Sequence, residues 1–155
     1  MSDVALVYDR LRFDVLLELG DLLSDEGYET AVNISLFTDA RVLPEELPAG
    51  ESERRGWWGD EFNDIAGDQI GSKLWLLDRS KISEDTRNRA EEYAKDALQW
   101  FIDDGIAESV KVTATLVNKT ERIDIGVEIA RPRVKDLYYY RFQLVWDGQL
   151  KAKKV

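Results

Sequence analysis

The last third of the chain alternates between apolar and polar residues in three successive runs. Alternation at every second residue is typical of β-strands that bury one face. The apolar members are Val110, Val112, Ala114 and Leu116, then Ile123, Ile125, Val127 and Ile129, and finally Tyr138, Tyr140, Phe142, Leu144 and Trp146. Turn-forming residues 118–121 and 131–133 separate the runs. The pattern predicts a three-stranded antiparallel meander with one apolar face.

A different spacing precedes the meander, between Ser83 and Gly105. Apolar residues recur there at steps of three and four, which is the period of an amphipathic helix. They are Ala90, Tyr93, Ala94, Ala97, Leu98, Phe101 and Ile102. We therefore predict a helix over residues 84–104, with Ser83 as its N-cap and Gly105 as its stop. This helix should cover the apolar face of the meander, because neither element can bury its apolar side alone.

The N-terminal half predicts smaller elements. Residues 4–8 and 13–17 are expected to form a hairpin, and residues 26 to about 40 a helix capped by Ser24 or Asp25. Two prolines place residues 43–56 in a loop, a short helix is expected within 68–79, and the basic end at 149–155 is expected to be disordered or to bind an acidic surface. The fold class is then α+β: one domain, residues 1–155, in which the antiparallel three-stranded C-terminal meander packs on a long amphipathic helix, with an N-terminal hairpin and helix.

Composition narrows the possible functions. The 155 residues are 44% hydrophobic and 34% charged, as in soluble globular proteins, and the net charge of −10 argues against binding to nucleic acid or an anionic membrane. The chain has no histidine and no cysteine, which excludes histidine-based nucleophilic catalysis, disulfides and ordinary zinc sites. No signal-peptide pattern opens the chain, so a cytoplasmic origin is expected. We expect no cofactor and no metal.

One non-periodic segment carries an unusual concentration of large apolar side chains. Three of the five tryptophans, Trp57, Trp58 and Trp75, lie within residues 54–77. Gly56 and Gly59 bracket the doublet and permit backbone angles that other residues avoid. If the doublet is extended, its two rings point to opposite sides. The segment can be a plug in the core of its own domain or an anchor for another subunit, because tryptophan and arginine are enriched where binding energy concentrates. Both can hold at once, since the doublet faces two ways.

Acidic residues follow the doublet at positions 60, 61, 64 and 68. A carboxylate pair chosen from Asp60, Glu61 and Asp64 would suit hydrolysis of a glycosidic bond, with the neighbouring aromatic rings stacking on sugars. The competing interpretation is a solvated acidic segment. With 31 acidic residues in the chain, close spacing is expected by chance, and their spacing does not fit a calcium loop. The glycines at positions 56, 59, 67 and 71 do not form a phosphate-binding loop either, because no glycine-rich run precedes a helix with a lysine and a hydroxyl in the required order.

Two segments bear a family resemblance. Residues 55–60, Arg-Gly-Trp-Trp-Gly-Asp, and residues 70–77, Ile-Gly-Ser-Lys-Leu-Trp-Leu-Leu, resemble the Mu-like phage baseplate family. Its members are similar in role to the small lysozyme-like wedge protein, or sheath initiator, of T-even contractile tails. The likeness continues at residues 3–8, 29–32, 35–39 and 90–94.

The resemblance implies a structural protein and not an enzyme. It would lie in the virion tail baseplate, be assembled in the host cytoplasm, and occur in several copies in a sixfold arrangement. Its partners would be baseplate wedge and hub proteins and the tail sheath protein, without nucleic acid or membrane. A sheet edge, supplied by residues 138–146 or 110–117, could accept a strand from the sheath subunit.

We expect the partner-binding residues to come from the tryptophan segment and from the polar side of the last strand. They are Arg55, Gly56, Trp57, Trp58, Gly59, Asp60, Trp75, Tyr139 and Arg141. Two other functions stay open from the sequence alone. One is a tail-associated glycan hydrolase that uses carboxylates near Asp60, and the other is a regulatory binding module unrelated to tails.

Overall fold

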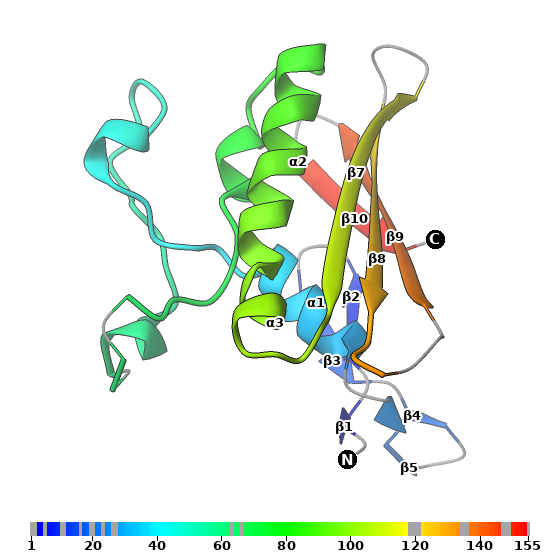
Figure 1. Cartoon of the computed structure of the whole chain (residues 1–155). Helices are drawn as coiled ribbons and strands as arrows, with labels where there is room; N and C mark the ends of the chain where they lie inside the picture. Colours follow the sequence, from blue (N-terminus) through cyan, green and yellow to red (C-terminus); the bar gives the residue numbers. More distant parts are fainter. Residues whose placement is uncertain are drawn as a thin grey trace.

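The computed structural model describes residues 28–62, 64, 65, 67–117, 122–133 and 137–141 with their side chains (Figure 1). It also describes the backbone of the strands between residues 3 and 25, of residues 142–146 and of residues 150–154. The strands are β1 (Asp3–Val4), β2 (Leu6–Asp9), β3 (Arg12–Val15), β4 (Leu17–Glu18), β5 (Asp21–Leu22), β6 (Ser24–Asp25), β7 (Ser109–Val117), β8 (Arg122–Ala130), β9 (Leu137–Trp146) and β10 (Leu150–Lys154). The α-helices are α1 (Tyr28–Phe37), α2 (Glu84–Leu98) and α3 (Trp100–Asp103), and the 3-10 helices are η1 (Pro44–Glu46), η2 (Trp58–Phe62) and η3 (Leu74–Leu77).

The main sheet has the strand order β10-β9-β8-β7, and all of its pairs are antiparallel. Val112, Val127 and Tyr140 lie in register across three strands and are all buried. The predicted meander is therefore confirmed, with its apolar face inward. For the basic end, the disordered alternative was wrong, because residues 150–154 form β10, which pairs with β9 and adds a fourth strand.

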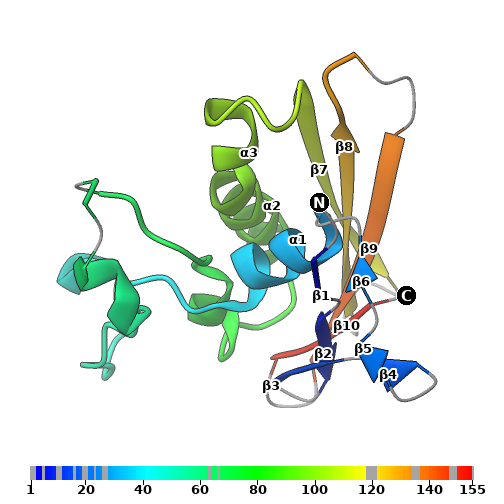
Figure 2. The same cartoon turned by 90° about the horizontal axis from the view of Figure 1, so that it is seen from below.

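The helices lie on one face of this sheet, with α2 alongside β7 (Figures 1 and 2). Ser83 caps α2 as predicted, because its hydroxyl accepts a hydrogen bond from the amide of Thr86. The predicted single helix over 84–104 is interrupted at Gln99, whose amide bonds to Asp96 three residues back and tightens the turn. The short helix α3 follows, and Gly105 ends it with a φ of 70°.

The core lies between the helices and the apolar face of the sheet. Its fully buried large side chains are Phe101, Leu36, Leu77, Leu98, Ile123, Ile125, Ile129, Val32, Val42 and Val127. A smaller cluster beside it contains Val42, Trp75 and Leu76. No helix in the described part of the chain is long and apolar enough to span a membrane.

The N-terminal predictions were partly right. β2 and β3 form the expected hairpin, with Asp9 opposite Arg12. The proposed caps of the first helix were wrong, because Ser24 and Asp25 pair with β1 and the helix begins only at Tyr28. The helix expected within 68–79 is reduced to η3, since Gly71 adopts a φ of 105° that a helix cannot contain.

The described residues between positions 43 and 72 extend away from the helices before the chain returns to η3 (Figures 1 and 2). We call residues 56–71 the aromatic arm. It begins and ends beside the stretch that follows α1, residues 38–42. The arm contains most of the predicted partner-binding residues.

Candidate interaction site

Backbone hydrogen bonds fix both ends of the aromatic arm to residues 38–42. At one end, the Val42 amide donates to the carbonyl of Arg54, at 3.2 Å. At the other end, the Ser72 amide donates to the Thr38 carbonyl at 2.9 Å, and the Ala40 amide donates to the Ser72 carbonyl at 3.0 Å. Both ends of the arm are therefore hydrogen bonded to the same short segment, and they are not free loop ends.

Glycines make this base possible. Gly56 and Gly71 have φ angles of 103° and 105°, in the region that favours glycine. A Cβ on Gly56 would overlap the side chain of Arg41, and a Cβ on Gly71 would overlap the carbonyl oxygen of Thr38. Both glycines are thus required by a close approach of the backbone to residues 38–41. Gly56 is one of the predicted partner-binding residues, and in the structure it allows the backbone to approach Arg41 closely.

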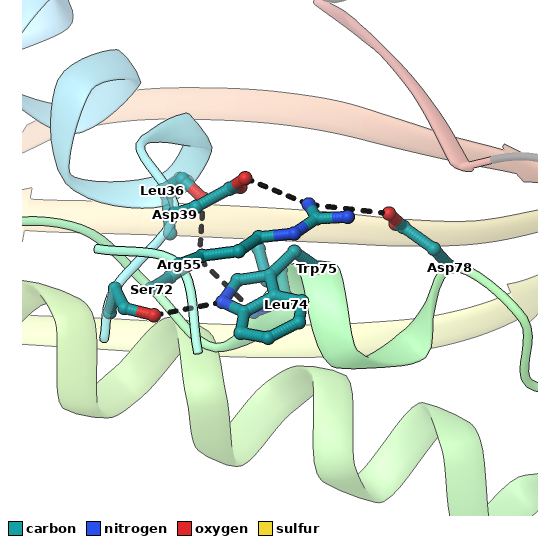
Figure 3. Close-up of polar contacts among 8 residues, drawn as sticks. Leu36, Asp39, Arg55, Ser72, Leu74, Trp75 and Asp78 are labelled. Atoms are coloured by element: carbon teal, nitrogen blue, oxygen red, sulfur yellow. Dashed lines mark hydrogen bonds and ion pairs between the residues drawn. The ribbon is translucent and has the colours of Figure 1, made fainter. Parts of the chain in front are cut away.

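Arg55 and Trp75 come together at the base of the arm (Figure 3). One Nη of Arg55 lies 2.8 Å from the carboxylate of Asp39 and 3.8 Å from that of Asp78. The guanidinium group also stacks over the Trp75 ring, 4.4 Å from its centroid. The Trp75 indole is almost fully buried and donates to the Ala40 carbonyl at 2.9 Å. Of the tryptophans in the motif, Trp75 is therefore the core plug.

A hydroxyl group ties the same base to α1. Ser72 is buried, and its Oγ donates to the carbonyl of Leu36 at 2.5 Å while accepting from the Leu74 amide at 3.2 Å (Figure 3). The first of these bonds satisfies a carbonyl at the end of α1, and the second satisfies an amide at the start of η3. Ser72 thus connects the helix to the returning end of the arm.

The carboxylate of Asp78 has an unusual protonation equilibrium. Burial raises the pKa of Asp78 to about 6, and the nearby Asp39 carboxylate acts in the same direction. The positive charges of Arg55 and Arg79 oppose this rise in the pKa but do not cancel it. Asp78 therefore changes charge in the range of pH 5–7, beside a guanidinium group that faces two carboxylates.

The tryptophan doublet is in solvent. Trp57 and Trp58 are 44% and 73% exposed, so the core-plug interpretation of the doublet was wrong. The doublet is not extended either, because Trp58 starts the 3-10 helix η2. The Trp57 ring lies directly on the backbone of Gly59, where any Cβ would overlap it. Gly59 is therefore buried beneath the Trp57 ring, and the absence of a side chain at this position leaves room for that ring.

The acidic residues of the arm divide into one with a structural contact and others on the surface. Asp60 accepts a hydrogen bond from the amide of Ile70 through Oδ1, at 3.2 Å, which joins the outgoing and returning halves of the arm. Glu61, Asp64 and Asp68 are exposed. Among the residues that the structure describes, no group of three or more acidic side chains is placed to hold a metal ion.

Tyr139 and Arg141 lie elsewhere, on the face of the sheet opposite the buried Tyr140. Tyr139 is 61% exposed, and its hydroxyl lies 3.0 Å from the point where a Cβ on Gly126 would be. The Tyr139 side chain thus covers Gly126 on the neighbouring strand β8, which has no side chain of its own. The predicted site is consequently split: the arm residues are together, and the two β9 residues belong to the outer face of the sheet.

The edge of the sheet also has a feature that the sequence did not reveal. β7 pairs with β8 and with no other described strand, whereas residues 142–146 of β9 lie between β8 and β10. The suggestion that β9 supplies the edge was therefore wrong for that half of the strand. On β7, the Ala114 amide donates outward to the Glu91 carboxylate of α2, at 2.9 Å. No sequence signal marks Glu91, because it is one of several acidic residues on the polar side of α2.

The chain belongs to the family described as phage protein GP46, whose family model matches residues 28–136. One relative is the baseplate protein gp46 of Escherichia phage Mu, with 44% identity over 115 residues, 74% of this chain and 77% of that protein. Another is the Mu-like prophage FluMu protein gp46 of Haemophilus influenzae, with 46% identity over 115 residues and the same coverage of both chains. These similarities confirm the resemblance to a Mu-like baseplate family.

Proposed function

We propose that this chain is a structural component of the tail baseplate of a Mu-like contractile tail. In this role it binds wedge and hub neighbours and offers a sheet edge on which the first sheath subunits assemble, with several copies arranged around a sixfold axis. The name of the phage Mu relative supports the place in the baseplate. The observation that carries the assembly role is the edge of β7, which pairs with no described strand other than β8 and whose Ala114 amide is held by the Glu91 side chain.

The geometry of β7 suits the addition of a strand. In an antiparallel pair, hydrogen bonds to the neighbouring strand alternate along the chain, so alternate residues present their amide and carbonyl to the other side. The outward amide of Ala114 fixes this phase. The backbone amide and carbonyl groups therefore also point outward at Val110, Val112 and Leu116. The strand contains no proline and pairs with β8 in continuous register, so its edge can serve as a template.

Proline substitution tests this edge. Proline at Val110, Val112 or Leu116 removes an outward amide and leaves the β7–β8 hydrogen bonds in place. Variants that retain the native circular dichroism should support less sheath growth on isolated baseplates that carry them. Lys111→Ala, on the outer face of the same strand, serves as the control and should support normal growth. Normal sheath growth from every folded proline variant would overturn the proposal for β7.

The aromatic arm supports the proposed binding of wedge neighbours. Trp57 and Trp58 are exposed on a segment whose two ends are hydrogen bonded to residues 38–42, and exposed tryptophans frequently dominate the energy of an interface. We expect Trp58→Ala to remain folded and to lose co-purification with wedge proteins. If the folded variant still co-purifies with them in normal yield, Trp58 is not an anchor.

The hydrolase hypothesis is not favoured by any contact in the site. One oxygen of Asp60 holds the Ile70 amide, which is a structural use of that carboxylate. Glu61 and Asp64 lie exposed on the arm. A rate of peptidoglycan cleavage by the purified protein that Asp60→Asn abolishes would revive the hypothesis.

A further inference from the structure

The aromatic arm carries a patch of rings that its own domain leaves in solvent. Trp58 and Phe62 are 73% and 76% exposed, and Ile65, three residues further on, is 70% exposed. The ring centroids of Trp57 and Trp58 are 5.6 Å apart, and those of Trp58 and Phe62 are 6.1 Å apart in an edge-to-face arrangement. We call Trp57, Trp58 and Phe62 the aromatic patch.

The patch is held in a fixed position before any partner arrives. Gly59 lies under the Trp57 ring, and Asp60 bonds across the arm to Ile70. The base of the arm is hydrogen bonded at both ends to residues 38–42. A preorganised patch loses little conformational entropy on binding, which is the arrangement expected of an interface anchor.

The charges around the patch restrict what can cover it. Residues 56–72 contain four acidic side chains, at positions 60, 61, 64 and 68, and no lysine or arginine. Three of them, Glu61, Asp64 and Asp68, are exposed. An acidic rim repels nucleic acid and anionic lipid and attracts cationic groups. Lysine and arginine also bind favourably over the face of an exposed indole ring.

We infer that the aromatic patch binds a protein segment whose apolar side chains are flanked by lysine or arginine. This inference rests on the proposed structural role, since it names the chemistry of one neighbour in the assembly. A second copy of this chain is a poor match, because each copy carries a net charge of −10. The apolar side chains would cover Trp58 and Phe62, and the cationic groups would meet the carboxylates of Glu61 and Asp64.

A photo-cross-linking experiment tests the inference in the full chain. p-Benzoyl-phenylalanine replaces Phe62, whose exposure makes the change tolerable to the fold. The same analogue replaces Leu137, an exposed apolar residue on the sheet, as the control position. Both proteins are irradiated in cells that produce assembled tails, and the cross-linked peptides are identified by mass spectrometry. We expect a peptide rich in apolar residues with flanking lysine or arginine from position 62 and not from position 137.

A charge reversal provides the second measurement. Adding Glu61→Lys and Asp64→Lys should lower the cross-link yield by about tenfold, because the cationic segment is then repelled. The matched pair Glu92→Lys and Asp96→Lys, on the exposed side of α2, makes the same change in net charge and should lower the yield by less than about twofold.

Several outcomes would overturn the inference. A cross-linked peptide without basic residues, a cross-link to lipid, a cross-link to a second copy of this chain, or no cross-link above the control position would each do so. Equal loss of yield in both charge-reversed pairs would also do so. None of these outcomes affects the β7 experiment, which is read by sheath growth, so failure of the arm and failure of the edge are distinguishable.

Discussion

Removing the carboxylate of Glu91 should weaken the fold and open the edge of β7 at the same time. Glu91 Oε2 accepts the Ala114 amide at 2.9 Å and lies 3.8 Å from an Nη of Arg87. A hydrogen bond to a charged group contributes about 1.5–3 kcal/mol, and we take the lower end because an amide at a sheet edge can reach water once the side chain is gone. The gain in helix propensity on Glu91→Ala offsets a few tenths of a kcal/mol. The net loss of unfolding free energy should be about 1–1.5 kcal/mol.

The neighbouring residue supplies the control. Glu92 is exposed on the same helix, so Glu92→Ala makes the same change in charge and in helix propensity and should alter stability by less than about 0.5 kcal/mol. Glu91→Gln keeps an acceptor and should lie between the two. Urea unfolding measures stability, and amide hydrogen exchange of Ala114 reports on the hydrogen bond directly. Equal stabilities for the two alanine variants, with unchanged exchange at Ala114, would refute the reasoning. On baseplates, Glu91→Ala should raise the rate of sheath growth because the outward amide is then free.

Three further predictions concern the arm and the core. The pKa of Asp78 in the folded protein is raised to about 6 from its usual 3.8, so wild-type stability should fall as the pH rises from about 4 to 6 relative to Asp78→Asn. Solvent screening at this partly exposed side chain reduces the effect, so we expect Asp78→Asn to be more stable than wild type by about 1–2 kcal/mol at pH 7 and equal to it at pH 4. The exposed Asp96→Asn is the control. A difference in stability between Asp78→Asn and wild type that stays constant across this pH range would contradict the prediction. Gly71→Ala should cost at least about 3 kcal/mol in thermal or urea unfolding, because it combines backbone strain with an overlap on Thr38, whereas Gly67→Ala, with the same sign of φ but open space around it, should cost about 1–2 kcal/mol. Phe101→Ala should cost about 3–5 kcal/mol in urea unfolding, and a loss below 1 kcal/mol would mean that the ring is not tightly packed.

The elements with a regular period were predictable from the sequence. Alternation in β7, β8 and β9 marks the buried face, and the burial of Val112 and Ile125 confirms it. The three- and four-residue spacing of α2 was equally clear, and its cap at Ser83 was predicted from a local preference. These features depend on residues that are close in sequence, which is why pattern alone identifies them.

The features that depend on contacts between distant residues were missed. Ser24 and Asp25 are good helix caps by local preference, but pairing with β1 places them in a strand. The basic end has no strand pattern of its own, so the sequence alone predicts a tail. It forms a strand because it pairs with β9. In the tryptophan motif, the sequence could not tell which indole is buried. Trp75 is the buried indole because it donates to the Ala40 carbonyl and stacks under the Arg55 guanidinium group, and both of these residues are distant from it in sequence.

The junction between α1 and the aromatic arm has a mechanical consequence. Thr38 continues from α1 through a hydrogen bond between its amide and the Ile34 carbonyl, and the same short stretch receives both ends of the arm. Motion about a hinge needs a few residues whose backbone angles are free to change. Here both ends of the arm are hydrogen bonded to residues 38–42, so a force on the arm would act on the segment that continues directly from α1. A partner that binds the aromatic rings would in this way act on the helices that pack against the sheet.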